Sequence, residues 1–398
     1  MASQRQPFPT LDKPSARASA TPMTAPALMP VLRPHLPSAA ELVPYLEEID
    51  QRRWYSNSGP LVTRLEEQLS RRLGLSSRGV VTTANATLGI TVALMARRVP
   101  EGSICLMPSW TFAATPHAAR AAGLRPWFLD VDRQTWALNP DHVTEALQRM
   151  PSPVGALIVV SPFGAPIDVR AWELFEDRTG IPVIVDAAAS FDATPASRLP
   201  FVVSLHATKI LGAGEGGFIA SSDSKFLERV KACCNFGFQG SRNAMLRSLN
   251  AKMSEYHAAV ALASLASWPE TRQKHVRIME WYRRSVLPLE RVSLQPKYGQ
   301  GWVSGTTSVM LPPRTRDRVS RSLLESRVET RLWWGTGCHT QAAFLDCPRG
   351  PLPVTEELGA RVLGLPHFPD MRKHDVDAVI NSLAEALSGR AGVRLQIA

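Results

Sequence analysis

The stretch VGALIVVSPFGAPIDVRAWELFEDRTGIPVIVD, residues 154–186, decides the fold. Its apolar runs at 156–160 and 182–185 have the length and unbroken hydrophobicity of strands that are buried on both faces. We expect a helix at 169–178 between them, with Asp168 as its N-cap. A strand, a helix and a second strand in this order are typical of a parallel sheet, whose neighbouring strands need a long crossover connection.

The same alternation continues on both sides of this stretch. Further strands are expected at 79–82, 104–107, 126–129, 201–204 and 217–220, the last two joined by a glycine-rich loop. Helices are expected at 39–49, 61–73, 87–97, 116–122, 140–148, 225–234, 253–268 and 269–289. From residue 292 the pattern becomes mixed α+β and ends in a helix at 376–387. The pattern predicts an α/β protein with a mostly parallel sheet covered by helices on both faces.

Three segments are expected along the chain. Residues 1–28 are rich in Pro, Ser, Ala and Thr, so they bury too little apolar surface to fold and are expected to form a disordered tail. A targeting peptide is the alternative for this segment, which has Arg and Ser but little acid. Residues 29–268 are expected to form a large domain that holds the sheet, and residues 269–398 a smaller C-terminal domain.

Composition excludes several classes of protein. The 398 residues are 44% hydrophobic, which excludes a wholly disordered chain, and no apolar run approaches the roughly 18 residues of a membrane span. The formal charge is +10, but the basic residues are dispersed, and we find no signature of nucleic-acid binding. The five cysteines show no metal or redox spacing, and the first 30 residues have no apolar core of the kind that a secretory signal needs. We expect a cytoplasmic protein without a structural metal.

Two ionisable residues follow predicted strands, where open α/β sheets bind their ligands. Asp186 ends the run 181–185, and a buried carboxylate there serves a protonated ring nitrogen or a metal, unless it is only a helix cap. Lys209 lies in SLHATKILGAGEGG, residues 204–217. A partly buried lysine has a lowered pKa and can attack a carbonyl, although this residue taken alone resembles a surface loop lysine.

Two further features complete a possible cofactor site. Asn85, Ala86 and Thr87 start the helix at 87–97, where free backbone N–H groups and a hydroxyl bind anions, although an ordinary cap has the same sequence. Phe112 follows the strand at 104–107, where an aromatic ring either stacks on a planar ligand or joins the core. A phosphate cradle, a stacking ring, an acid for a pyridinium nitrogen and a Schiff-base lysine are together what pyridoxal phosphate (PLP) requires.

On these stretches the chain resembles the DegT/StrS family of PLP-dependent sugar aminotransferases. The resemblance covers about residues 30–387. Its specific stretches are SGPLV (58–62), PSWTFAAT (108–115), FLDVD (128–132), FG (163–164), VDAA (185–188), residues 204–217 and NAKMSE (250–255). It implies the fold type I aminotransferase architecture, with a mostly parallel seven-stranded sheet between helices in the large domain and a smaller α+β C-terminal domain.

The resemblance also implies the catalytic residues. Lys209 matches the Schiff-base lysine, Asp186 the partner of the pyridine nitrogen, and Phe112 the residue that stacks on the ring.

The phosphate-binding residues follow in the same way. Ala86, Thr87 and Ser204 match residues that hold the cofactor phosphate. Asn250 matches an asparagine that reaches the phosphate from the neighbouring subunit, which implies a homodimer with shared active sites.

Two positions depart from the family pattern. Ala86 replaces a glycine, which restricts the backbone but keeps its N–H donor. Ala189 replaces a glutamine that contacts the phenolic side of the cofactor, and Ser190, His206 or a water is expected to substitute for it. On the substrate side, His339 is a weaker candidate, for which a core or surface histidine is the alternative.

A lysine at position 209 argues against the family branch that has histidine there and dehydrates sugars. We therefore expect a transaminase that moves an amino group from glutamate, leaving 2-oxoglutarate, to a nucleotide-linked keto-deoxysugar. The DAAA sequence at 186–189 favours dTDP-4-keto-6-deoxyhexose, for surface polysaccharide or secondary-metabolite sugars. The alternatives are a PLP-dependent sugar dehydratase or lyase, which needs no amino donor, and a non-catalytic regulatory relative.

Overall fold

The computed structural model describes residues 27–388, so most of the predicted tail lies outside the described residues. Met29 already pairs with Val328 through a parallel bridge, and Val31 is buried. The chain is therefore packed against the rest of the fold from residue 29 onward.

A seven-stranded sheet forms the centre of the molecule. Its strands are β1 Val80–Thr83, β2 Ile104–Pro108, β3 Arg125–Leu129, β4 Val154–Val160, β5 Val183–Asp186, β6 Phe201–Ser204 and β7 Gly217–Ala220. Their order is β1-β7-β6-β5-β4-β2-β3. Strand β7 runs in the opposite direction to the other six strands of this sheet, which all run the same way. The predicted α/β architecture with a mostly parallel seven-stranded sheet is confirmed.

Helices surround this sheet where the alternating pattern predicts them. They are α1 Ala39–Arg52, α2 Pro60–Arg72, α3 Ala86–Ala96, α4 Ala114–Ala121, α5 Pro140–Leu147, α6 Val169–Thr179, α7 Ser224–Cys234 and α8 Glu255–Ala266. The predicted cap of α6 is present, because the Asp168 side chain accepts a hydrogen bond from the Ala171 N–H at 3.1 Å.

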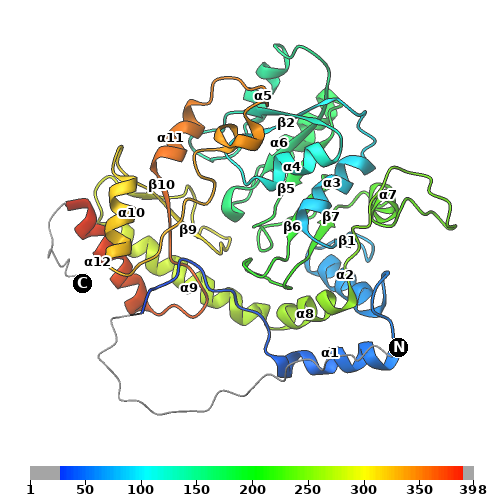
Figure 1. Cartoon of the computed structure of the whole chain (residues 1–398), viewed down its shortest axis with the longest axis horizontal. Helices are drawn as coiled ribbons and strands as arrows, with labels where there is room; N and C mark the ends of the chain where they lie inside the picture. The colour runs from blue at the N-terminus through cyan, green and yellow to red at the C-terminus, as the bar shows by residue number, and fades with distance from the viewer. Residues whose placement is uncertain (1–26, 389–398) are drawn as a thin grey trace, which may run out of the picture.

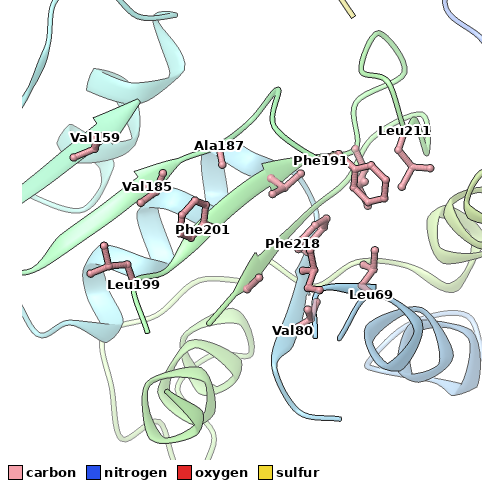
Figure 2. Close-up of a cluster of buried hydrophobic side chains, with 14 of the residues drawn as sticks. Leu69, Val80, Val159, Val185, Ala187, Phe191, Leu199, Phe201, Leu211 and Phe218 are labelled. Atoms are coloured by element: carbon pink, nitrogen blue, oxygen red, sulfur yellow. The ribbon is translucent and has the colours of Figure 1, made fainter. Parts of the chain in front are cut away.

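Each central strand is buried on both faces because its alternate side chains enter two different clusters. Val183 and Val185 of β5 pack in the cluster that includes α2, α5, α6 and α8, whereas Ile184 packs with α3, α4 and α7. Figure 2 shows the first cluster, in which Val185 lies beside Phe201 of β6 and Phe218 of β7 lines the same face. This two-sided burial accounts for the unbroken apolar runs in the sequence.

A second, smaller sheet lies in the C-terminal part of the chain. Its strands are β8 Ser293–Leu294, β9 Thr307–Met310 and β10 Val362–Leu365, antiparallel in the order β10-β9-β8. The helices in this part are α9 Trp268–Val286, α10 Arg316–Glu325, α11 Pro353–Arg361 and α12 Lys373–Ser388.

Helix α9 connects the two sheets (Figure 1). Trp268 at its start packs in the core of the large sheet, and Tyr282 near its end packs in the core of the small one. Three short 3-10 turns complete the fold: η1 Pro162–Gly164, η2 Cys338–Thr340 and η3 Ala342–Phe344. Cys338 and Phe344 return to the core of the large sheet, while the division of the chain at residue 269 stays a prediction.

Among residues 27–388, no helix combines the length and the apolar composition that crossing a membrane requires.

Candidate active site

The predicted site residues converge on one edge of the large sheet. Strands β1, β2, β5 and β6 end at this edge, and β7 begins there because it runs antiparallel to β1 and β6. The start of α3, the turn after β2 and the loop between β6 and β7 therefore lie around the same place. This is the edge at which open α/β sheets bind their ligands.

Asp186 is the buried anionic group of this edge. It is 6% exposed, its Oδ2 accepts a hydrogen bond from Thr115 Oγ1 at 2.7 Å, and its Oδ1 accepts one from the Ala188 N–H at 3.2 Å. Burial raises the pKa of Asp186, whereas the two hydrogen bonds and the charge of Lys209 lower it. The carboxylate is thus suited to a cationic partner.

Lys209 lies half-buried in the loop between β6 and β7. Backbone hydrogen bonds fix this loop, among them Lys209 N–H to His206 O at 2.8 Å and Ala213 N–H to Leu205 O at 2.6 Å. Burial lowers the pKa of Lys209, and the charge of Asp186 opposes this effect. No hydrogen bond or ion pair within the described chain occupies its Nζ, so the amine is available to react.

The start of α3 offers an anion cradle. The Asn85 side chain caps Leu88 N–H at 2.9 Å, and within residues 27–388 no group accepts from the N–H of Ala86 or Thr87. Ser204 lies beside this cradle because it pairs with Gly217, which also pairs with Thr83 at the end of β1. Free N–H groups at a helix start favour a phosphate.

Phe112 follows β2 and is 61% exposed, which is unusual for a large aromatic side chain. Its turn is braced by η2, because Cys338 N–H donates to Ser109 O at 2.8 Å and His339 Nδ1 lies 2.8 Å from Ser109 Oγ. An uncovered ring on a braced turn at this edge can stack on a planar ligand.

Asn250 is not joined to the other predicted residues. Its exposed side chain accepts a hydrogen bond from Lys252 Nζ at 2.8 Å. The next residue, Ala251, lies closer to the cradle, because its carbonyl oxygen accepts a hydrogen bond from Ala84 N–H at 2.7 Å. A role for Asn250 in a second subunit therefore stays a prediction.

Comparison with known proteins decides the family. Residues 38–384 match the DegT/DnrJ/EryC1/StrS aminotransferase family. The chain belongs to this family. It is 28% identical to the Mycobacterium tuberculosis protein Rv3402c over 375 residues, with 90% of each chain covered.

Two solved structures are also similar over most of both chains. DesI, solved in the presence of its TDP-sugar product, is 33% identical with a TM-score of 0.82, covering 92% of this chain and 95% of DesI. A Bacillus cereus protein assigned to the PLP-dependent aminotransferases is 30% identical with a TM-score of 0.85, covering 89% and 99%. The prediction of a PLP-dependent aminotransferase is confirmed.

The structure shows the surroundings of Ala86 and Ala189, the two positions that depart from the family pattern. Ala86 does not have a positive φ, so the alanine fits the first turn of α3 without backbone strain. Near Ala189, Ser190 Oγ is buried without a hydrogen-bond partner in the described chain, whereas His206 Nδ1 lies 2.8 Å from Thr208 Oγ1. His339 is buried against Ser109, so it braces the turn after β2.

Two buried polar groups near the site were missed by sequence reasoning. The first is Thr115, whose only signal is its place four residues after Thr111. The second is a histidine pair in which His275 Nδ1 lies 3.0 Å from His367 Nε2, and His367 Nδ1 lies 2.8 Å from Thr307 Oγ1. A cavity of about 10 Å³ separates this pair from the Lys209 loop.

PLP fits the residues at this edge. The free N–H groups could bind its phosphate, and the exposed Phe112 could stack on its ring. The buried Asp186 could pair with its ring nitrogen, and the free amine of Lys209 could react with its aldehyde. A metal has less support, because the described residues contain no group of three or more His, Cys, Asp or Glu side chains that could hold one.

Substituting Gly217→Ala should damage the cradle. A Cβ at this position would lie 2.8 Å from Ala86 N and 3.0 Å from Ala86 Cα, which are backbone atoms that cannot move aside cheaply. We expect a loss of about 1–3 kcal/mol in the free energy of unfolding and weaker PLP binding, measured by denaturation and by cofactor titration. Gly350→Ala is the control, because nothing lies within 4 Å of its added Cβ. Equal behaviour of the two variants would contradict the packing argument.

The histidine pair should make the protein sensitive to acid. Burial lowers the pKa of His275 to about 4 and also lowers that of His367. Below the ordinary histidine pKa of about 6.5, the unfolded chain therefore binds protons that the folded chain excludes. We expect His275 to contribute a fall of about 3 kcal/mol in the free energy of unfolding between pH 6.5 and pH 4.

Denaturation across this pH range checks the expectation. His275→Asn should flatten the pH dependence, and the exposed His374→Asn should leave it unchanged. Parallel curves for the wild type and His275→Asn would show that His275 is not the titrating group.

Proposed function

We propose that the protein transfers an amino group from glutamate to a nucleotide-linked keto-deoxysugar, with Lys209 and Asp186 as the catalytic residues. The observation that carries the proposal is the position of the Lys209 amine. It has no hydrogen-bond or ion-pair partner among the described residues, and its loop lies at the same sheet edge as the buried carboxylate of Asp186. Burial lowers the pKa of Lys209 and so favours the neutral amine, which is the form that acts as a nucleophile or base.

The residues divide the work between binding and proton transfer. The N–H groups of Ala86 and Thr87, with Ser204, hold the phosphate, and Phe112 fixes the plane of the ring. When bound, PLP supplies an electron sink for the electrons released at the α-carbon of the donor. Lys209 Nζ would accept the proton from that α-carbon as a base and would then donate it as an acid.

The substrate class is supported by similarity and by charge. DesI was solved with a TDP-sugar product, and this chain is 33% identical to it. The formal charge of +10 suits a substrate that carries a diphosphate. We propose dTDP-4-keto-6-deoxyhexose as the acceptor, in the synthesis of surface polysaccharide or secondary-metabolite sugars.

A homodimer with shared sites belongs to the same proposal. Asn250 is exposed rather than turned into its own cradle, and the exposed stack of Tyr55 on Tyr256, with ring centroids 6.3 Å apart, offers an apolar surface for a second copy. Asn250 of one subunit would then bind the phosphate held by the other.

The covalent role of Lys209 can be tested directly. The holoenzyme should absorb visible light, and borohydride reduction followed by peptide mapping should place a pyridoxyl group on Lys209. Lys209→Ala should lose the label and at least about 10³-fold in turnover, because one group both attaches the cofactor and moves the proton. Lys373→Ala, which removes an exposed lysine on α12, is the control. A label elsewhere would overturn the assignment.

The substrate can be tested by product mass. Incubation with glutamate and nucleotide-linked 4-keto or 3-keto deoxysugars should give an amino sugar only from the 4-keto compound, together with 2-oxoglutarate. Turnover of the sugar without glutamate would favour a dehydratase or lyase instead. A PLP-loaded protein that converts none of these sugars would favour a regulatory relative.

A further inference from the structure

A chain of three buried side chains leads to the carboxylate of the site. Thr111 Oγ1 lies 2.7 Å from Thr115 Oγ1, which lies 2.7 Å from Asp186 Oδ2. Thr111 is 1% exposed and Thr115 is 0% exposed, so water does not compete for these hydroxyl groups. Thr115 is separated from Asp186 by 71 positions in the sequence, and the fold brings them together.

Both threonine hydroxyl groups donate their protons toward Asp186. An ionised carboxylate only accepts hydrogen bonds, so the single hydroxyl proton of Thr115 must go to Asp186 Oδ2. The Thr115 oxygen is then free to accept, and Thr111 donates to it. Each hydroxyl therefore stabilises the negative charge at the end of the chain.

The backbone holds both hydroxyls in place. Thr115 lies in the first turn of α4, with its N–H bonded to Phe112 O at 3.2 Å. Thr111 is held from the other side by η2, because Cys338 Sγ lies 3.2 Å from Thr111 O and Cys338 N–H bonds to Ser109 O. The hydroxyls are thus aimed before any ligand arrives.

Asp186 needs this support because its surroundings favour the neutral acid. Burial is the largest influence on its pKa and raises it, and the hydrogen bond from Thr115 is the largest opposing one, followed by Ala188 N–H and the charge of Lys209. The Lys209 charge disappears once its amine is used in catalysis. Thr115 and Ala188 then remain as the groups that favour the anion.

We propose that Thr115, aligned by Thr111, is a positioning residue that keeps Asp186 ionised and thereby keeps a shared proton on the ring nitrogen of bound PLP. The proposal rests on the proposed roles of Asp186 and PLP. A carboxyl and a pyridine nitrogen share one proton, and each hydrogen bond donated to the carboxylate shifts that proton toward the nitrogen. Without Thr115 the proton moves to Asp186, and the ring loses the charge that makes it an electron sink.

The first experiment uses the protein without PLP. Thr115→Val keeps the shape of the side chain but removes the hydroxyl, and Thr115→Ser restores it. On lowering the pH, we expect the infrared band of a protonated carboxyl group to appear at a higher pH in Thr115→Val than in the wild type and in Thr115→Ser. The double variant with Asp186→Asn should lose this band. Appearance of the band at the same pH in Thr115→Val and in the wild type would overturn the proposal, whatever the protein does with PLP.

The second experiment uses the holoenzyme with ¹⁵N-labelled PLP. In Thr115→Val the ¹⁵N shift should move toward that of an unprotonated pyridine, with kcat reduced about 10- to 100-fold and KM nearly unchanged. Thr111→Val keeps the direct bond to Asp186, so its effects should be smaller. A wild-type shift in Thr115→Val, or equal losses in the Val and Ser variants, would overturn the positioning role.

The two experiments separate the proposals. Failure of the wild type to bind PLP while the infrared result holds would refute the proposed function and leave the coupling of Thr115 to Asp186 standing.

Discussion

The site depends on keeping one carboxylate charged where burial favours its neutral form. Asp186 ends a central strand with almost no exposure to water, and its charge persists only through the donors and the amine around it. The same burial lowers the pKa of Lys209, which makes its amine usable. Burial at this edge thus shifts the pKa values of both groups in the directions that the proposed counter-ion and base require, and open solvent would remove both shifts.

The architecture supplies this desolvation through its strand directions. Because β7 is antiparallel, its first residue lies at the same edge as the ends of β1 and β6, and Gly217 can approach the start of α3 without a side chain in the way. The short loop between β6 and β7 then returns over the end of the sheet and carries Lys209 toward Asp186. The phosphate cradle, the acid and the amine are therefore fixed by one sheet, and the C-terminal segment at η2 braces the turn that carries Phe112.

Local sequence patterns predicted the strands whose ends are set by the residues next to them. Strands 201–204 and 217–220 were predicted to the residue, because unbroken apolar runs end sharply at polar residues or glycines. Strand β4 begins at Val154, two residues before the expected start, since Gly155 weakens the strand pattern while the sheet includes it next to a register shift opposite Ile104. The resemblance to the family located Lys209 and Asp186, and the structure places both at the predicted edge.

Polar contacts between residues far apart in the sequence could not be predicted from local patterns. Thr115 looks like any threonine in a helix, and the partners His275 and His367 are 92 positions apart with no shared local pattern. Their contacts arise only when distant elements pack. The proposed role of Asn250 needs a second chain, so the contacts of a single chain cannot display it.

The choice of lysine at position 209 follows from chemistry rather than from charge. The chain prefers arginine strongly, with only eight lysines among its 45 basic residues, so a basic group of either kind suffices at most positions. At position 209 it does not, since arginine stays protonated in proteins and can neither attack a carbonyl nor accept a proton from carbon. Burial lowers the pKa of a lysine amine and so favours its neutral form, as it does at Lys209. Lysine, the least common basic residue of the chain, therefore stands where the proposed function requires a removable proton.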